Sequence, residues 1–168
     1  MKNKQKQYSK IYDEHVERIY RFICLKVGSV EMAEDITSQV FIKCWKRFKD
    51  GLKFDNESAY LFKVARAEVA NHYRKNSKYK IISTSSAQEI PSPAKSPEEE
   101  EEIKWQVNKA QGLLAKLKEE YQDILILRYI DGYDIDEIAL MLNKTEANVR
   151  VMAHRALKAL RELMENER

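Results

Sequence analysis

The side chains best placed for chemistry lie near the C-terminus, and the chemistry they offer is recognition of nucleic acid. Thr145 is a typical N-cap residue, and apolar residues recur at helical spacing after it, which predicts a long final helix with one buried face. Arginine binds guanine edges or phosphates, small apolar side chains contact thymine methyl groups, and glutamate accepts from cytosine. The outer face of this helix carries such side chains, namely Glu146, Ala147, Arg150, Val151, His154, Arg155 and Lys158.

The segment before this helix predicts the first half of a helix-turn-helix. Asp134 and Glu137 have capping-box spacing, which predicts a short helix over residues 134–142, and Asn143-Lys144 predicts a tight turn. In a helix-turn-helix the second helix enters the major groove with its N-terminal residues at the base edges. A generic helical hairpin with a solvated outer face explains the same pattern, so the spacing alone leaves DNA binding open.

A second candidate site mixes cations with aromatic rings over residues 60–80. Aromatic rings stack on unpaired bases while cations follow the phosphates, so this composition favours single-stranded nucleic acid. The rings are Tyr60, Phe62, Tyr73 and Tyr79, and the cations are Lys63, Arg66, Arg74, Lys75, Lys78 and Lys80. The alternative is that Tyr60 and Tyr73 lie partly in the core, and we expect this for some of these rings.

A third candidate site is the polar face of the second predicted helix. Ile42 lies on this face, and an exposed isoleucine among mixed charges is typical of a protein-docking surface. A solvated helix face has the same composition. The surrounding residues are Glu34, Asp35, Ser38, Gln39, Lys43 and Lys46.

The chain offers little for catalysis or metal binding. Several carboxylates cluster over residues 131–137, but they lie at the turn and cap of a predicted helix, where acidic residues have a structural role. No nucleophile–base pair stands near them. The two cysteines and three histidines form no metal-ligand spacing. We therefore expect no enzyme, no metal and no cofactor.

All these candidate sites lie on predicted helices. The chain has only four glycines, and its three prolines fall within residues 91–97, so helix breakers are rare elsewhere. Helical spacing predicts three helices before the prolines, over about residues 8–27, 33–50 and 56–77. It predicts four helices after them, over residues 99–115, 118–130 and 134–142 and from Thr145 onward. The fold class is therefore all-α, with Trp45 and Ala110 among the side chains expected in the core.

Charge and composition divide these helices into two domains. Residues 1–80 hold 18 Lys or Arg and 10 Asp or Glu, a net charge of +8, which favours a polyanionic partner. Residues 81–102 have a net charge of −5 and contain the three prolines, whereas residues 103–168 have no net charge. We predict two small helical domains, 1–80 and 103–168, joined by a flexible acidic linker over 81–102.

The sequence contains no predicted membrane or secretion signal. No stretch of 18 apolar residues is present, and the basic N-terminus is followed by an amphipathic segment instead of an apolar signal core. Both cysteines, Cys24 and Cys44, lie inside apolar helical patterns, which fits a reducing compartment. We therefore expect a cytoplasmic protein with no direct insertion into a membrane.

Taken together, the motifs resemble a known family, the small two-domain extracytoplasmic-function (ECF) sigma factors of bacterial RNA polymerase. Residues 33–45, AEDITSQVFIKCW, look like the helix with which that family binds core polymerase. Residues 60–75 resemble its promoter-melting and −10-reading helix, and residues 125–156 resemble its −35-reading domain. The chain departs from the frequent family residues at Ser38-Gln39, Asn71 and Lys118, where Gln-Glu, Asp and Pro are common.

The resemblance implies a role for individual residues. It implies binding of core polymerase by Asp35, Ser38, Gln39, Ile42 and Lys43. It implies contacts with the −10 element by Lys63, Arg66, Asn71, Arg74 and Lys75, with an unpaired base held over residues 50–58. It implies contacts with the −35 element by Arg128, Thr145, Glu146, Ala147, Asn148, Arg150, Val151, His154 and Arg155.

The function implied is that of a sigma factor, which binds core RNA polymerase and directs promoter recognition and transcription initiation. The implied partners are core RNA polymerase, promoter DNA and an anti-sigma factor. Two other functions fit the same residues. One is a helix-turn-helix transcription regulator that acts without core polymerase, and the other is a helical adaptor that binds only protein.

Overall fold

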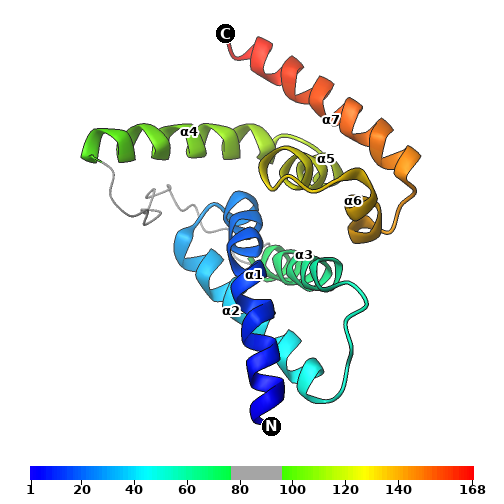
Figure 1. Ribbon diagram of the computed structural model, residues 1–168. Coiled ribbons are helices and arrows are strands. Elements are labelled where there is room, and N and C mark those ends of the chain that lie inside the picture. Colours follow the sequence, from blue (N-terminus) through cyan, green and yellow to red (C-terminus); the bar gives the residue numbers. More distant parts are fainter. Residues whose placement is uncertain (77–95) are drawn as a thin grey trace.

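The N-terminal domain consists of three packed helices. The computed structural model describes residues 1–76 and 96–168, and every regular element within these ranges is helical (Figure 1). Lys2–Val27 form α1, Val30–Lys49 form α2 and Glu57–Asn76 form α3. Gly28 ends α1 in the left-handed conformation with φ 72°, which glycine adopts without strain.

Side-chain caps fix where the next two helices start. The Ser29 hydroxyl accepts from the backbone N–H of Met32 at 3.4 Å at the start of α2. The side-chain oxygen of Asn56 accepts from the N–H of Ala59 at 2.8 Å at the start of α3. Each cap satisfies a donor that the first helical turn leaves unpaired, and the Asn56 cap lies at the start of the helix predicted over residues 56–77.

The C-terminal domain contains a helix-turn-helix, as predicted. Pro97–Ala115 form α4, Glu119–Leu125 form α5, Ile126–Ile130 form the π-helical turn η1, Ile135–Leu142 form α6 and Glu146–Asn166 form α7. Asp134 and Glu137 make the predicted capping box of α6, and the Thr145 hydroxyl accepts from the N–H of Asn148 at 3.2 Å. Asn143 turns the chain between α6 and α7 with φ 53°.

Each domain buries its own apolar stripe. In the N-terminal domain the Phe22 and Phe62 rings meet edge to face at 4.8 Å, and the Tyr8 hydroxyl donates to the Phe41 carbonyl at 2.5 Å. In the C-terminal domain Ile124 and Val149 are fully buried between α5, α6 and α7. These contacts hold the outer faces of α2, α3 and α7 in fixed orientations, because the buried face of each helix is locked by packing.

Three expectations are corrected by the structure. Ala110 is exposed, because α4 packs only lightly on its neighbours. Trp45 is half-buried, since its ring lies on Tyr8 at 5.2 Å and leaves its other side open. The helix predicted over residues 99–115 already starts at Pro97, because Ser96 and Glu99 form a capping box and Pro97 occupies the first turn. Tyr79, Lys78, Lys80 and residues 81–95 lie outside the described residues.

The two domains pack against each other. Helices α3 and α6 are in contact, as are α1 and α4, and the buried residues of both domains belong to one continuous cluster. Figure 1 shows α6 beside α3, while α7 lies on the side away from the first three helices.

The buried cysteine in α2 allows a direct test of the core. Cys44 is fully buried, and burial raises the pKa of its thiol to about 12. A thiol reacts through its thiolate, so we expect Cys44 of the folded protein to resist a disulfide reagent at pH 8 and to react only after unfolding. Mass spectrometry of the labelled protein measures this, and rapid labelling of Cys44 in the native state would contradict the core packing.

Candidate functional site

The outer face of α7 carries the predicted −35 contacts. Every one of these residues on α7, from Glu146 to Arg155, is exposed, as is the cap residue Thr145. The apolar stripe of Val149, Met152 and Ala156 is buried on the opposite side. Arg150 and Glu146 form an exposed ion pair at 3.2 Å, one turn apart. The face is therefore open to a ligand and presents cations beside Ala147 and the half-exposed Val151.

Arg128 lies on η1, whereas the other predicted −35 contacts lie on α7 or at its N-cap. Its guanidinium donates to the Tyr133 carbonyl at 2.9 Å and lies 3.3 Å from the Asp134 carboxylate. These bonds brace the turn between η1 and α6. That turn contains Gly132 with φ +75°, a conformation that favours glycine. Arg128 thus supports the turn that leads into α6, the first helix of the helix-turn-helix.

The predicted −10 contacts divide into two groups on α3. Lys63, Arg74 and Lys75 are exposed, and half-buried Asn71 accepts from Arg74 Nη2 at 2.8 Å. Arg66 is engaged with the other domain. Its Nε lies 2.9 Å from Asp123 Oδ2 and 3.8 Å from Glu119 Oε1.

The loop before α3 was predicted to hold an unpaired base. Phe54 in this loop stacks on Phe48 at 5.6 Å and approaches Tyr60 at 4.8 Å, so the aromatic rings anchor the loop to both helices. Gly51 has φ +103°, which lets the chain turn away from α2. Leu52 is 39% exposed on this loop.

The predicted polymerase-binding residues all lie exposed on α2. Asp35, Ser38, Gln39 and Ile42 share one face at helical spacing, and the Ile42 side chain is 53% exposed. Lys43 is turned toward α3, where it pairs with Glu68. An exposed isoleucine framed by polar side chains has the anatomy of a docking surface.

A groove that the sequence did not reveal borders this face. It encloses about 370 Å³ between α1 and α2. Tyr12 of α1, which is 43% exposed, and Ile42 of α2 both line it. Its lining also includes Tyr8, Thr37, Ser38, Phe41 and Trp45.

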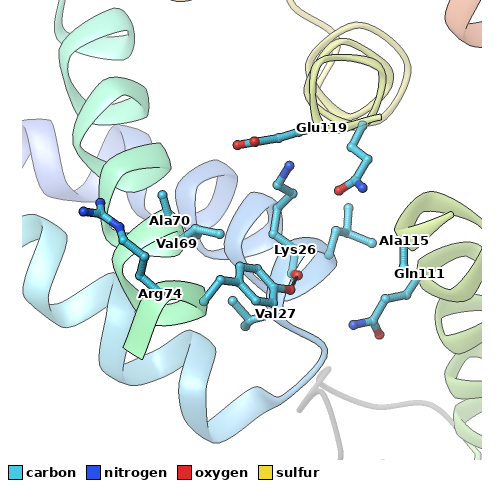
Figure 2. A pocket seen from close by; sticks show the side chains of 11 residues that line it. Lys26, Val27, Val69, Ala70, Arg74, Gln111, Ala115 and Glu119 are labelled. Carbon is cyan, nitrogen blue, oxygen red and sulfur yellow. Dashed lines mark hydrogen bonds between the residues drawn. The ribbon is translucent and has the colours of Figure 1, made fainter. Parts of the chain in front are cut away.

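A larger pocket of about 730 Å³ lies between the two domains (Figure 2). Lys26 and Arg74 line it from α1 and α3, and Gln111 and Glu119 line it from α4 and α5. The Tyr73 hydroxyl donates to the Lys26 carbonyl within it. The second half of α3 therefore borders a space that exists only while the domains are packed together.

Two buried carboxylates lie at the domain interface. Burial raises the pKa of the Asp123 carboxyl above its ordinary value, with Lys26 acting in the opposite direction. Burial likewise raises the pKa of Asp131, opposed chiefly by Arg21. In both cases the loss of hydration outweighs the attraction of the neighbouring cation.

One cluster among the described residues has the composition of a cation site. Glu14, His15 and Glu57 each place one ligand atom within 4.8 Å of the others. His15 Nε2 and Glu57 Oε2 are 3.3 Å apart, and this contact ties α1 to the first turn of α3. This cluster was not predicted from the sequence, because Glu57 is far from Glu14 and His15 along the chain.

Comparison with protein families identifies both halves of the chain. The model of sigma-70 region 2 matches residues 11–79, and the model of sigma-70 region 4 matches residues 108–160. The two matches together cover more than half of the chain and follow the order of the two domains. The chain belongs to the sigma-70 family. We refer below to its N-terminal and C-terminal domains as the region 2 and region 4 domains.

Curated relatives place this sigma factor in the extracytoplasmic-function group. It is 27% identical to the ECF sigma factor BldN of Streptomyces coelicolor over 95% of this chain and 61% of BldN. It is 26% identical to SigX of Bacillus subtilis over 96% of this chain and 85% of SigX. It is thus shorter than BldN, spanning about three fifths of that relative. A sigma factor is a transcription initiation factor and is not an enzyme.

Solved structures show the same fold. CnrH, in complex with the cytosolic domain of CnrY, matches with a TM-score of 0.72 at 16% identity over 98% of this chain and 91% of CnrH. The sigma factor RpoE of Bartonella quintana, in complex with the anti-sigma factor NepR, matches with a TM-score of 0.70 at 18% identity over 97% of this chain and 99% of RpoE. These likenesses establish the two-domain helical architecture. No helix in residues 1–76 or 96–168 is long and apolar enough to cross a bilayer.

Proposed function

We propose that this sigma factor docks on core RNA polymerase through α2 and reads promoter DNA through α3 and α7. The observation that supports this most directly is that two sigma-70 regions occur in order on one chain, each with an exposed face where the family contacts are expected. Neither rival function needs both regions. A regulator that acts alone requires only the helix-turn-helix, and an adaptor requires no basic face.

The docking surface in this proposal is the exposed face of α2 together with the neighbouring groove. Asp35, Ser38, Gln39 and Ile42 make the polar and apolar contacts, and Lys43 lies at the edge of the face. The groove between Tyr12 and Ile42 receives an apolar side chain of the polymerase. Buried apolar anchors inside a polar rim are the pattern that gives affinity in protein interfaces.

The two DNA-reading surfaces have different tasks. On α3, Lys63, Arg66, Asn71, Arg74 and Lys75 hold the melted −10 strand by its phosphates and bases. On α7, the residues from Thr145 to Arg155 enter the major groove of the −35 element with the N-terminus leading. Arg150 lies near that end and reads a base, whereas Arg155 lies more than one turn further on and contacts phosphate.

Regulation by an anti-sigma factor is part of the proposal. CnrH and RpoE were both solved with protein partners, and the partner of RpoE is an anti-sigma factor. We place this chain in the cytoplasm, where RNA polymerase works. The proposed anti-sigma factor would control access to the surfaces on α2, α3 and α7.

Co-purification with core RNA polymerase tests the proposal. Tagged full-length protein is expected to retain purified core enzyme, and the complex is expected to bind promoter fragments that the free protein binds weakly. A protein that binds promoter DNA without retaining core enzyme would be a stand-alone regulator. A protein that binds neither would be an adaptor, and either result would refute the assignment.

A further inference from the structure

The interface between the domains contains ion pairs besides its apolar contacts, and the charges of these pairs are sorted by domain. The region 2 domain supplies the cations Arg21, Lys26 and Arg66, whereas the region 4 domain supplies the carboxylates of Glu119, Asp123 and Asp131. We call these six residues the interdomain latch. Arg66, which the proposed function assigns to the phosphates of DNA, is therefore paired with carboxylates of region 4.

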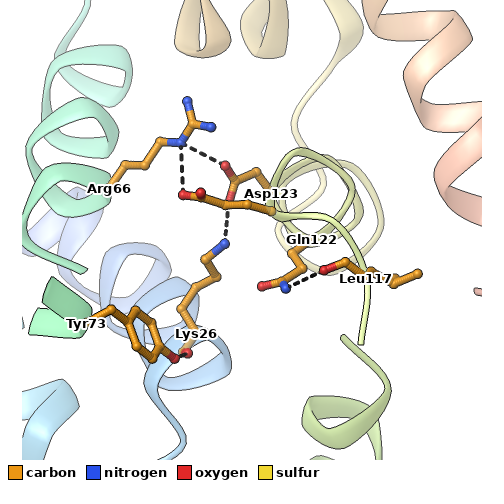
Figure 3. Close-up of polar contacts among 7 residues, drawn as sticks. Lys26, Arg66, Tyr73, Leu117, Gln122 and Asp123 are labelled. Atoms are coloured by element: carbon orange, nitrogen blue, oxygen red, sulfur yellow. Dashed lines mark hydrogen bonds and ion pairs between the residues drawn. The ribbon is translucent and has the colours of Figure 1, made fainter. Parts of the chain in front are cut away.

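The centre of the latch is the Asp123 side chain of α5 (Figure 3). Lys26 Nζ donates to Asp123 Oδ1 at 2.8 Å, and Arg66 Nε lies 2.9 Å from Asp123 Oδ2. The Lys26 and Asp123 side chains are 4% and 0% exposed. Figure 3 shows Lys26 and Arg66 reaching this one carboxylate from two different helices of region 2.

A second ionic contact extends the latch along α1. Arg21 Nη1 donates to Asp131 Oδ1 at 2.8 Å, and the Asp131 side chain is 1% exposed. The neighbouring Arg18 guanidinium lies 4.6 Å from the centre of the buried Tyr133 ring. The turn before α6 is thus held to α1 by two arginines, and the same turn orients the helix-turn-helix.

An ion pair with a buried partner contributes little net stability. Removing charges from water is costly, and the pair persists only while both partners are present and well oriented. When the domains separate, the buried side chains of Lys26, Asp123 and Asp131 return to water, and the cations of region 2 become available to other ligands. A polyanion can then replace the carboxylates, because guanidinium groups bind phosphates and carboxylates in the same way.

We infer that the latch is an autoinhibitory contact, in which Asp123 of region 4 occupies Arg66 of the DNA-binding face and Asp131 helps to hold the two domains closed through Arg21. Arg66 cannot pair with Asp123 and with a DNA phosphate at the same time. The closed conformation leaves α7 exposed while α5 and α6 lie against region 2. Promoter binding therefore requires that the latch opens. This inference rests on the proposed role of Arg66 in contacting DNA.

The expected result is that opening the latch strengthens binding to single-stranded DNA. The test compares the full-length wild type with a variant carrying Asp123→Ala and Asp131→Ala. The probe is a fluorescent mixed-sequence 20-nucleotide strand. If the closed form dominates, the competent fraction is below about one tenth, so the variant should bind at least about tenfold more tightly. Its radius of gyration in X-ray scattering should rise at the same time.

Matched controls separate this effect from a general change of charge. Glu120 and Asp136 are exposed acidic residues on α5 and α6, and Glu120 pairs with Lys144 inside its own domain. Replacing both with alanine should change neither size nor DNA affinity. Adding Arg66→Ala to the open variant should remove most of the gained affinity. If the open variant loses helicity by circular dichroism, Asp123→Asn provides an isosteric substitute.

Two results would overturn the inference that the latch is autoinhibitory. One is an open variant that does not expand, and the other is an open variant that expands without binding DNA more tightly. Core-polymerase pull-down of the same variants reports on the proposed function separately, because docking depends on α2. Expansion and tighter DNA binding without retention of core polymerase would support the latch and refute the polymerase-docking role.

Discussion

Replacing Asp35 and Ile42 together with alanine is expected to lower the affinity for core RNA polymerase by at least about 2 kcal/mol, roughly thirtyfold. Both residues lie on the exposed face of α2, and Ile42 is 53% exposed at the rim of the groove. Neither contributes to the buried core, so the far-ultraviolet circular dichroism and the thermal midpoint should stay unchanged. The measurement is a titration of labelled variant with core enzyme.

Two further variants make this result specific. Asp13 and Met164 are an exposed acid and an exposed apolar residue away from α2, and replacing both with alanine should leave docking unchanged. Phe22 is 1% exposed, so Phe22→Ala should lower the free energy of unfolding by about 3–5 kcal/mol. This variant serves as the reference for a folding defect. Loss of fold in the Asp35 and Ile42 variant would contradict its placement on the surface. Trp45 cannot serve as this control because its ring lines both the core and the groove.

Replacing Arg150 with alanine is expected to cost about 1–3 kcal/mol on a preferred −35 sequence and to relax preference at one or two base pairs. Arg150 is exposed in the second turn of α7, where a helix entering the major groove N-terminus first meets the bases. Its present partner, Glu146 at 3.2 Å, is exposed and easily replaced by a base edge. Run-off transcription on a panel of −35 variants measures the preference.

Arg155→Ala is expected to behave differently from Arg150→Ala. Its position further along α7 favours a phosphate contact, so the loss should be uniform across sequences and should lower the salt dependence by about one contact. Arg161 is exposed on α7 about 16 Å beyond Arg150 and serves as the control that should show no effect. If Arg150→Ala lowers output equally on every −35 variant, then α7 is rotated or docked in another way.

Local signals in the sequence predicted most of the fold. Asn56, Asp134 and Thr145 marked helix starts because capping depends only on neighbouring residues. Even the departure at Lys118 leaves the fold unchanged, since this residue has φ −58°, close to the angle that proline would impose. The exposed faces of α2 and α7 followed from the same periodicity that placed their opposite faces in the core.

Contacts between the domains could not be predicted in this way. Lys26 and Asp123 are 97 residues apart, and neither the spacing nor the charge of their own segments indicates the other. Arg66 was therefore predicted only as a DNA contact, although it pairs with Asp123 in the closed conformation. Ala110 was misplaced for a related reason, because periodicity predicts a buried face only where another element covers it.

Reconstituted run-off transcription tests the central claim most directly. Purified protein is added to core RNA polymerase with a library of genomic fragments as template, and the 5′ ends of the transcripts are sequenced. We expect transcripts from a discrete set of promoters that share −35 and −10 sequences and that appear only when protein and core enzyme are both present. Transcription that is unchanged by the protein, although the protein binds the same fragments without core enzyme, would contradict the sigma-factor assignment.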